Sequence, residues 1–197
     1  MDNDRSTPQV ASPAQSLCVR CGLCCDGTIF ERARLVPEDD LARLEAGGFI
    51  VLPTKTGTGF ALPCHHQQDR ICTLYQQWRP TVCHTFRCRL LRRFDTGELN
   101  LEEAQTIIER TTGLADQVWA QMQQRTGIGD GPLKKRFRAW ELSQGEPAWR
   151  RRHAAFLLDY ASLQRRLDRD FRLKPKQTEA GVANPTEPSQ IGAEDHE

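Results

Sequence analysis

Hydrophobic and polar residues alternate differently in the two halves of this chain, with short apolar runs first and helical spacing later. The apolar runs at residues 49–52 and 59–62 are separated by a polar stretch that contains Gly57. Two such runs joined by a short Gly-containing stretch are typical of neighbouring antiparallel strands. The pattern therefore predicts a β-hairpin whose loop is somewhat longer than two residues.

The segments around this hairpin predict further short elements. Residues 37–46 predict a helix, because Pro37 suits a first turn, the acids after it suit the positive helix end, and Gly47 stops it. Leu41 and Leu44 are expected to face the core. Short strands are predicted at residues 28–30 and 71–75, and a short helix is predicted at residues 79–86.

Beyond residue 90, apolar residues recur at helical spacing. Asn100 followed by Glu103 predicts a capped helix start, and the apolar positions after it share one face of a helix that reaches about Gln124. Residues 133–142 predict a second helix, and the glycine-rich residues 127–131 are interpreted as a linker. Pro147 opens a longer helix with a stripe that is expected to pack in the core: Trp149, His153, Phe156, Leu157, Tyr160, Leu163 and Leu167.

Both ends of the chain lack apolar periodicity. Residues 1–14 are predicted to be a disordered arm and residues 175–197 a disordered acidic tail. Residues 15–174 form one predicted domain, with a cysteine-cluster part at 15–90 and a helical part at 91–174. The expected fold class is α+β, with a small metal-binding half of β-hairpin and cysteine loops packed against C-terminal helices.

Charge is unevenly distributed although the formal net charge is only +1. Between residues 134 and 176, thirteen Lys or Arg stand against five Asp or Glu. Such a stripe can meet nucleic acid, but we interpret it mainly as the solvated faces of amphipathic helices. No apolar run approaches the ~20 residues that span a bilayer, and the N-terminus lacks a secretory signal pattern. A cytoplasmic protein without membrane contact is therefore expected.

All eight cysteines lie in two blocks, and three of the five histidines lie in the second block. The cysteines are Cys18, Cys21, Cys24 and Cys25 in the first block and Cys64, Cys72, Cys83 and Cys88 in the second. Because a reducing cytoplasm keeps thiols reduced, this pattern favours metal ligands over disulfides. The cysteines are therefore predicted to bind zinc or an iron–sulfur cluster, either in two four-ligand centres or in one centre with spare thiols.

The spacing within the first block carries further information. Cys18-x2-Cys21 predicts a tight knuckle that aims both sulfurs at one centre, with Gly22 supplying the freedom that a turn needs. Cys24 extends the run to a spacing that also binds iron–sulfur clusters. Cys25 is different, because adjacent side chains point in different directions. The doublet indicates a polynuclear cluster, two adjacent sites, or one ligand beside a free thiol.

With these residues the chain resembles a known family. The series C-x2-C-G-x-C-C, then Cys64, Cys72-Thr-Leu-Tyr75, Trp78-Arg79-Pro80-Thr-Val-Cys83 and Phe86, is similar to the YkgJ-type CxxCxxCC cysteine-cluster family over about residues 18–90. Flagellin lysine-N-methylase carries the same cluster. The resemblance implies a zinc- or iron-chelating domain whose cysteines hold a metal or iron–sulfur centre. His84 departs from the family pattern, which has Arg there, and no segment after residue 90 resembles a methyltransferase domain.

Several other residues of the second block are candidates for contact with the metal centre. Arg79 is a candidate cofactor-binding residue that would donate hydrogen bonds to sulfurs or balance their charge. The alternative is an ion pair with a carboxylate such as Asp26. Tyr75 is a second candidate, with a core aromatic role as the alternative. Both metal ligation and an ordinary surface role stay open for His65, His66 and His84.

Three functions remain open from the sequence. The leading hypothesis is a cytoplasmic metal-binding protein in which the two blocks jointly hold zinc or an iron–sulfur cluster. The second is a metal- or cluster-dependent enzyme, linked to protein methylation by family analogy alone, with no catalytic residue assigned. The third is a nucleic-acid-binding zinc module that uses the basic C-terminal helices.

Overall fold

The computed structural model describes residues 12–54, 57–125, 130–145 and 148–173 and has the predicted α+β architecture. The helices are α1 (Pro13–Cys21), α2 (Leu41–Ala46), α3 (Thr81–Thr85), α4 (Arg89–Asp95), α5 (Leu101–Gln123), α6 (Leu133–Leu142), α7 (Trp149–Arg152) and α8 (Ala154–Asp170). The strands are β1 (Arg32–Arg34), β2 (Val51–Thr54), β3 (Gly57–Ala61), β4 (Gln67–Gln68) and β5 (Ile71–Cys72). The predicted acidic tail, Pro147 and most of the glycine-rich linker lie outside the described residues.

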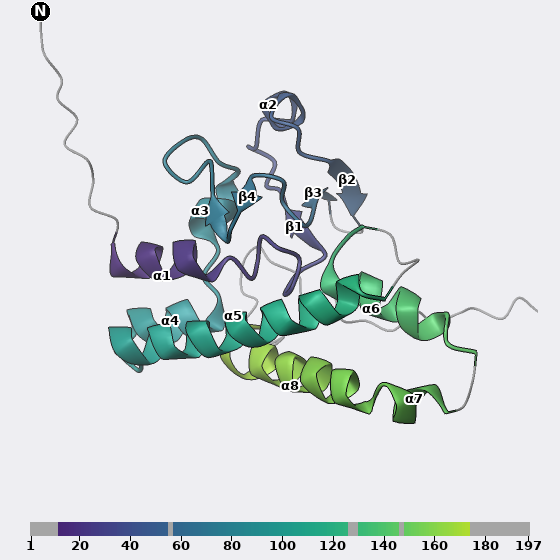
Figure 1. The fold of residues 1–197 in the computed structure, drawn as a ribbon. Coiled ribbons are helices and arrows are strands. Elements are labelled where there is room, and N and C mark those ends of the chain that lie inside the picture. The colour runs from purple at the N-terminus through teal and green to yellow at the C-terminus, as the bar shows by residue number, and fades with distance from the viewer. Residues whose placement is uncertain (1–11, 55–56, 126–129, 146–147, 174–197) are drawn as a thin grey trace, which may run out of the picture.

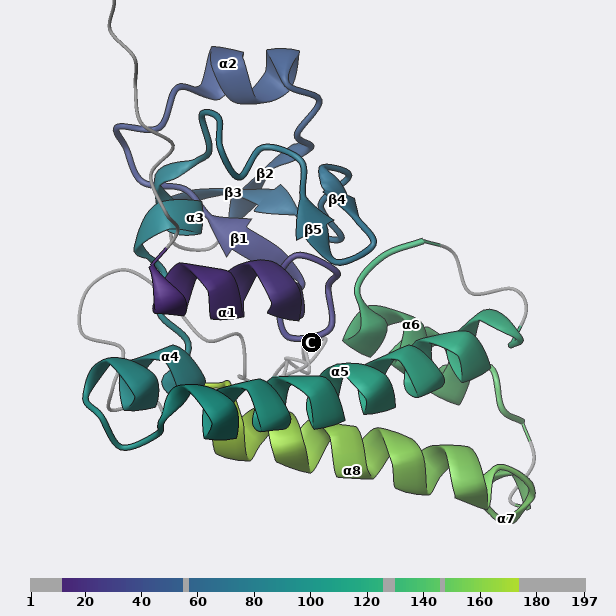
Figure 2. The ribbon, with the colours of Figure 1, turned by 60° about the vertical axis from the view of Figure 1, so that its left-hand side comes forward.

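The strands and the long helices form two halves, with α1 between them. In Figure 1 the sheet lies above α1, and α4, α5 and α8 lie below it. Figure 2 shows the same arrangement after a 60° turn, with α1 running across between β1 and α5. The first cysteines are therefore carried by the element that separates the two halves.

The predicted hairpin is confirmed as strands β2 and β3, which pair antiparallel with Val51 opposite Phe60. Strand β1 pairs with the other side of β3, which gives the sheet order β1-β3-β2. The strand predicted at residues 28–30 is wrong, since this third strand begins at Arg32. Thr28 lies in a bend instead, because its backbone N–H donates to Asp26 Oδ1 at 2.8 Å rather than to a neighbouring strand.

Helix α2 begins later than predicted, at Leu41 rather than at Pro37. Asp40 sets this start, because its side chain accepts a hydrogen bond from the backbone N–H of Arg43 at 3.0 Å. Leu44 is fully buried, as predicted, but Leu41 is 44% exposed and does not face the core. With so short a helix only one apolar face position reaches the small core, which contains Leu35, Leu44, Phe49, Phe60 and Leu62.

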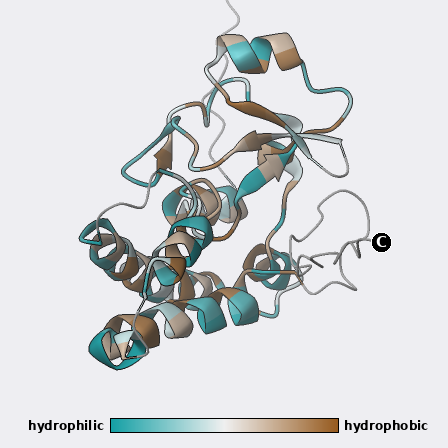
Figure 3. Cartoon of the chain, turned by 90° about the vertical axis from the view of Figure 1, so that its right-hand side faces the viewer, coloured by the Kyte–Doolittle hydropathy of each residue, from teal (hydrophilic) through white to brown (hydrophobic). Residues whose placement is uncertain are grey.

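The helical half is built around α5 and α8, which pack along each other. The start of α5 is confirmed, because the Asn100 side chain accepts from the Glu103 N–H at 2.9 Å while Glu103 accepts from the Asn100 N–H at 2.8 Å. Figure 3 shows hydrophobic and hydrophilic stripes along these helices, as amphipathic packing requires. The core positions of α5 and α8 include Ile108, Val118, Met122, Phe156, Leu163 and Leu167.

The helices differ from the predictions at two places. The helix expected to open at Pro147 is divided into α7 and α8 at His153, whose φ of −110° and ψ of 22° interrupt the helical backbone. Helix α1 is not among the predicted elements, and it begins at Pro13, inside the arm predicted to be disordered at residues 1–14. Ser12 and Gln15 form a capping box there, which stabilises the first turn. Within the described ranges, no helix combines the length and apolar character needed to cross a lipid bilayer.

Candidate metal centre

The first cysteine block lies at the C-terminal end of α1 and in the turn that follows. Cys18 and Cys21 share the last helical turn, so the predicted knuckle is instead a helix end. Residues three apart on a helix lie on the same face, which keeps these two side chains together. Gly22 then ends the helix with φ 65°, and the next turn carries Cys24 and Cys25.

The second block is distributed over short elements of the sheet half and the start of α4. Cys72 ends β5, a two-residue form of the strand predicted at 71–75, and Cys83 lies in α3, the short helix predicted at 79–86. Cys64 follows β3, as expected of a hairpin that leads into the site. Cys88 is buried at the N-cap position of α4. Four separate elements thus supply these cysteines.

The chain fold brings the two blocks together. The backbone N–H of Cys64 donates to the carbonyl oxygen of Cys25 at 2.8 Å, which joins residues that are far apart in the sequence. A cavity of about 50 Å³ lies among cysteines of both blocks and apolar side chains. Its cysteines are Cys18, Cys21, Cys24, Cys25 and Cys88. This volume exceeds the ~10–15 Å³ that one water-sized probe occupies, so a small ion fits.

Cys24 and its neighbours form one group of thiols. Burial raises the pKa of Cys24 well above its usual value, and repulsion from Cys88 and then Cys21 raises it further. The same two causes raise the pKa of Cys21, where Cys88 and Cys18 are the repelling thiols. Burial raises the pKa of Cys88 to about 11, with Cys18 adding to the shift. These four side chains are close enough for their charges to interact.

Cys25 belongs to a second group, although it is adjacent to Cys24 in the sequence. Burial raises its pKa, and Cys83 and then Cys64 are the thiols that repel it most. The pKa of Cys83 rises to about 12, mainly by desolvation and then by repulsion from Cys64, with Cys72 contributing less. The Cys83 residue is exposed, but the protein packed around its sulfur removes part of the water there. The thiols that act most strongly thus differ for the two members of the doublet, although Cys18 acts on both and Cys25 also acts on Cys24.

All eight cysteines are free thiols in this fold. In the portion of the chain that the structure describes, no three His, Cys, Asp or Glu side chains are arranged to hold one metal ion. The donor chemistry nevertheless fits a soft metal, since buried thiolates that repel one another gain from a shared cation.

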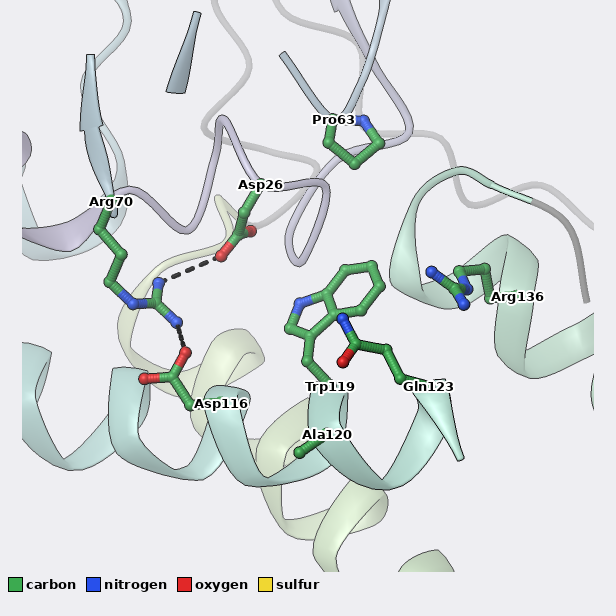
Figure 4. A pocket seen from close by; sticks show the side chains of 8 residues that line it. All are labelled: Asp26, Pro63, Arg70, Asp116, Trp119, Ala120, Gln123 and Arg136. Atoms are coloured by element: carbon green, nitrogen blue, oxygen red, sulfur yellow. Dashed lines mark hydrogen bonds and ion pairs between the residues drawn. The ribbon is translucent and has the colours of Figure 1, made fainter. Parts of the chain in front are cut away.

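Arg70 connects both cysteine blocks to helix α5, a role that no local pattern in the sequence indicates. Its guanidinium donates to the carbonyl oxygen of Cys21 at 3.2 Å and to Asp26 Oδ2 at 3.1 Å, and it also pairs with Asp116. Figure 4 shows Arg70 between the two carboxylates. Gln67 adds a hydrogen bond from Nε2 to the carbonyl oxygen of Gly22 at 2.9 Å. The turn between the first cysteines is therefore fixed from the second block.

Gly22 is required by this arrangement for two reasons. Its φ of 65° is a left-handed conformation that other residues adopt at a cost of about 1–2 kcal/mol, and a Cβ there would overlap Gln67 Nε2. We expect Gly22→Ala to lower the free energy of unfolding by about 1–3 kcal/mol in chemical denaturation. The matched control is Gly113→Ala on α5, where a Cβ meets nothing within 4 Å.

The control substitution should act in the opposite direction. Gly113 lies inside a helix, where Ala is favoured over Gly by about 0.5–1 kcal/mol, so Gly113→Ala should stabilise the protein. Equal changes in the unfolding free energy for Gly22→Ala and Gly113→Ala would contradict the role assigned to Gly22.

The two candidate cofactor-binding residues of the second block contact each other. The Arg79 guanidinium lies 4.0 Å from the centroid of the Tyr75 ring, and the Tyr75 hydroxyl donates to the carbonyl oxygen of Gln15 at 3.3 Å. Burial raises the pKa of Cys18, and the positive charge of Arg79 acts against this shift. The Arg79 guanidinium therefore lies near the Cys18 thiol. Asp26 pairs with Arg70 rather than with Arg79. This leaves Arg79 beside the cysteines, with Nε buried and without a hydrogen-bond partner.

The three histidines of the second block bind backbone carbonyls. His65 and His66 both direct Nε2 to the carbonyl oxygen of Gly47, at 3.0 and 2.9 Å. Their rings also contact Phe49 in the small core. The Nε2 atom of His84 lies 3.2 Å from the Arg79 carbonyl oxygen. These contacts give the histidines a structural role in the fold described here.

Comparison with known proteins identifies the cysteine-rich segment. Residues 17–111 match the family model CxxCxxCC, described as "Putative zinc- or iron-chelating domain". The match includes both cysteine blocks and extends into α5. It confirms the resemblance seen in the sequence. No curated protein and no solved structure matches the chain.

Proposed function

Residues 17–111 belong to the CxxCxxCC family of zinc- or iron-chelating domains, and from this premise we propose a protein with two four-thiolate metal centres. The first centre would use Cys18, Cys21, Cys24 and Cys88, and the second Cys25, Cys64, Cys72 and Cys83. Four thiolates suit either tetrahedral zinc or an iron–sulfur cluster. The observation that carries this division is that Cys88 and Cys21 repel Cys24 most, whereas Cys83 and Cys64 repel Cys25 most.

The number of cysteines supports two complete centres. Each proposed set contains four sulfurs, so no cysteine is left over. Electrostatics alone does not assign Cys18 to one set, because it raises the pKa of Cys25 and Cys83 as well as that of Cys21. Its place on the same helical turn as Cys21 assigns it to the first set.

Positive side chains near the thiols support the binding of thiolates. A zinc ion with four thiolates carries a formal charge of about −2, which nearby cations stabilise. Arg79 and Arg87 both lower the pKa of Cys18, which favours its thiolate form. Arg79 would therefore stabilise the loaded centre by charge, with Tyr75 holding its guanidinium in position through the ring contact.

The bound group would supply either structure or electron transfer. Zinc would order the cysteine turns without redox chemistry, whereas an iron–sulfur cluster would accept and release electrons. The proposal includes a cytoplasmic location, where thiols such as these stay reduced.

Elemental analysis combined with acid-labile sulfide analysis tests this function on protein purified without oxygen. Two zinc ions per chain and no sulfide would support two zinc centres. Iron with an equal amount of sulfide would support iron–sulfur clusters, and the iron count together with the cluster type, read from the visible and electron paramagnetic resonance spectra, would distinguish one cluster from two. A single metal ion per chain would contradict the division into two centres, and a metal-free protein that does not take up zinc or iron would contradict metal binding.

A further inference from the structure

An open cleft of about 470 Å³ lies between the first cysteine turn and the helical half. Figure 4 shows its side chains converging from the turn after Cys25, from Pro63, from helix α5 and from helix α6. The cleft is separate from the small cavity among the cysteines. It is therefore a distinct place where a small molecule fits, since clefts of ~300–1,000 Å³ are typical of ligand sites.

One wall of the cleft is flat and apolar. Trp119 and Ala120 contribute it from α5, and Pro63 lies across from them. The indole is held in place because Trp119 Nε1 donates to the buried Thr28 Oγ1 at 2.8 Å. A fixed, half-buried indole offers a preformed surface for a planar group, and stacking on it adds to the apolar area buried.

The charges of the cleft are separated. Arg70 is paired with the carboxylates of both Asp26 and Asp116, so this end holds one cation and two anions. Arg136 has no hydrogen bond or ion pair with any described residue, and its Nε is buried without a partner. Its guanidinium carbon lies 5.5 Å from the centroid of the Trp119 ring. Arg136 is therefore an unpaired cation next to an aromatic surface, on the far side of Trp119 from the two carboxylates.

We propose that this cleft binds a small anionic molecule with a planar apolar body. The anionic group would pair with Arg136, because a guanidinium binds carboxylate or phosphate oxygens with two parallel hydrogen bonds. The planar body would lie against Trp119. The carboxylates of Asp26 and Asp116 stay paired with Arg70 on the opposite side of the cleft, so the anionic group would lie away from them.

The cleft shares its wall with the backbone of both cysteine blocks. Asp26 follows Cys25 and Pro63 precedes Cys64, the two cysteines joined by the 2.8 Å backbone hydrogen bond. A molecule in the cleft would thus contact the residues next to Cys25 and Cys64 in the sequence. The inference does not depend on which metal the cysteines bind, so a failure of ligand binding leaves the metal proposal intact.

Calorimetric titration of the full-length protein with three matched probes tests the inference. Benzoate carries a carboxylate, phenyl phosphate carries a phosphate, and benzamide has the same ring without charge. At least one of the anions should bind at millimolar concentration or below and more tightly than benzamide. The tighter of the two anions identifies the head group. Absence of binding by both anions, or benzamide binding as tightly as they do, would overturn the proposal.

A pair of variants on helix α6 assigns the binding to Arg136. Arg136→Gln should weaken binding of the preferred anion by at least about tenfold, since a charged hydrogen-bonded pair is lost. Arg138→Gln removes the same charge from an exposed position on the same helix and should change the dissociation constant by less than about twofold. Equal effects of the two substitutions would show that the anion does not bind at Arg136. If Arg136→Gln does not fold, the comparison of the three probes on the unmodified chain still decides.

Discussion

Removal of the bound metal with a strong chelator is expected to unfold the sheet half and lower the melting temperature of the whole protein. Structural zinc contributes on the order of 10–16 kcal/mol to folding in small metal-dependent peptides. The sheet half has little else to hold it, since its hydrophobic cluster contains only five buried side chains among the described residues. Far-UV circular dichroism during heating, with metal content measured on the same sample, checks this result.

Hydrogen exchange separates local from global loss of structure. The amides of β1, β2 and β3 should lose protection when the metal is removed, whereas those of α5 and α8 should keep part of it because the helical core is larger. An unchanged melting temperature after complete metal removal would reject a structural role for the metal.

Two double variants distinguish two centres from one. Cys21→Ser with Cys24→Ser damages only the first proposed set, so about half of the metal should remain. Cys21→Ser with Cys83→Ser damages both sets, so almost no metal should remain. Equal metal content in the two double variants would contradict the division of the cysteines proposed here. Because both proteins lose two thiols, the comparison is matched for sulfur count.

Local signals in the sequence predicted the elements that local interactions determine. The capping box at Asn100 and the apolar spacing after it identified α5, and the apolar positions of residues 133–142 identified α6. Helix α4 was not predicted, because it is short and its N-cap residue, Cys88, makes no side-chain capping hydrogen bond. Helix α1 was not predicted although Ser12 and Gln15 form a capping box, because Pro13 falls in the polar segment interpreted as a disordered arm.

The candidate site shows a similar division. Cysteine spacing identified the residues and the family, since both depend on sequence alone. The grouping around Cys24 and Cys25 depends on how distant segments meet, which spacing does not encode. Arg70 illustrates the same limit, because its carboxylate partners are 44 and 46 residues away along the chain. A long-range ion pair of this kind leaves no periodic or local pattern.

Leu163→Ala is expected to lower the free energy of unfolding by about 2–5 kcal/mol, the second largest effect anticipated for this protein. Leu163 is fully buried on α8, in the core that this helix shares with α5. Leu158→Ala on the same helix is the matched control, because Leu158 is 64% exposed and its loss should change stability by less than about 0.5 kcal/mol. Urea denaturation of both variants gives the comparison.

Metal content measured on the same two variants shows whether the helical core and the cysteine site are independent. Cys21, Cys24 and Cys88 of the first proposed set pack against the helical core, but the metal would bind their sulfur atoms and not the apolar side chains. Leu163→Ala should therefore keep its full metal content at temperatures below its melting transition, while unfolding at a lower urea concentration. If Leu163→Ala lowers the free energy of unfolding no more than Leu158→Ala does, α8 does not contribute to the core as described. A Leu163→Ala protein that is folded but metal-free would instead show that helix packing sets the geometry of the thiols.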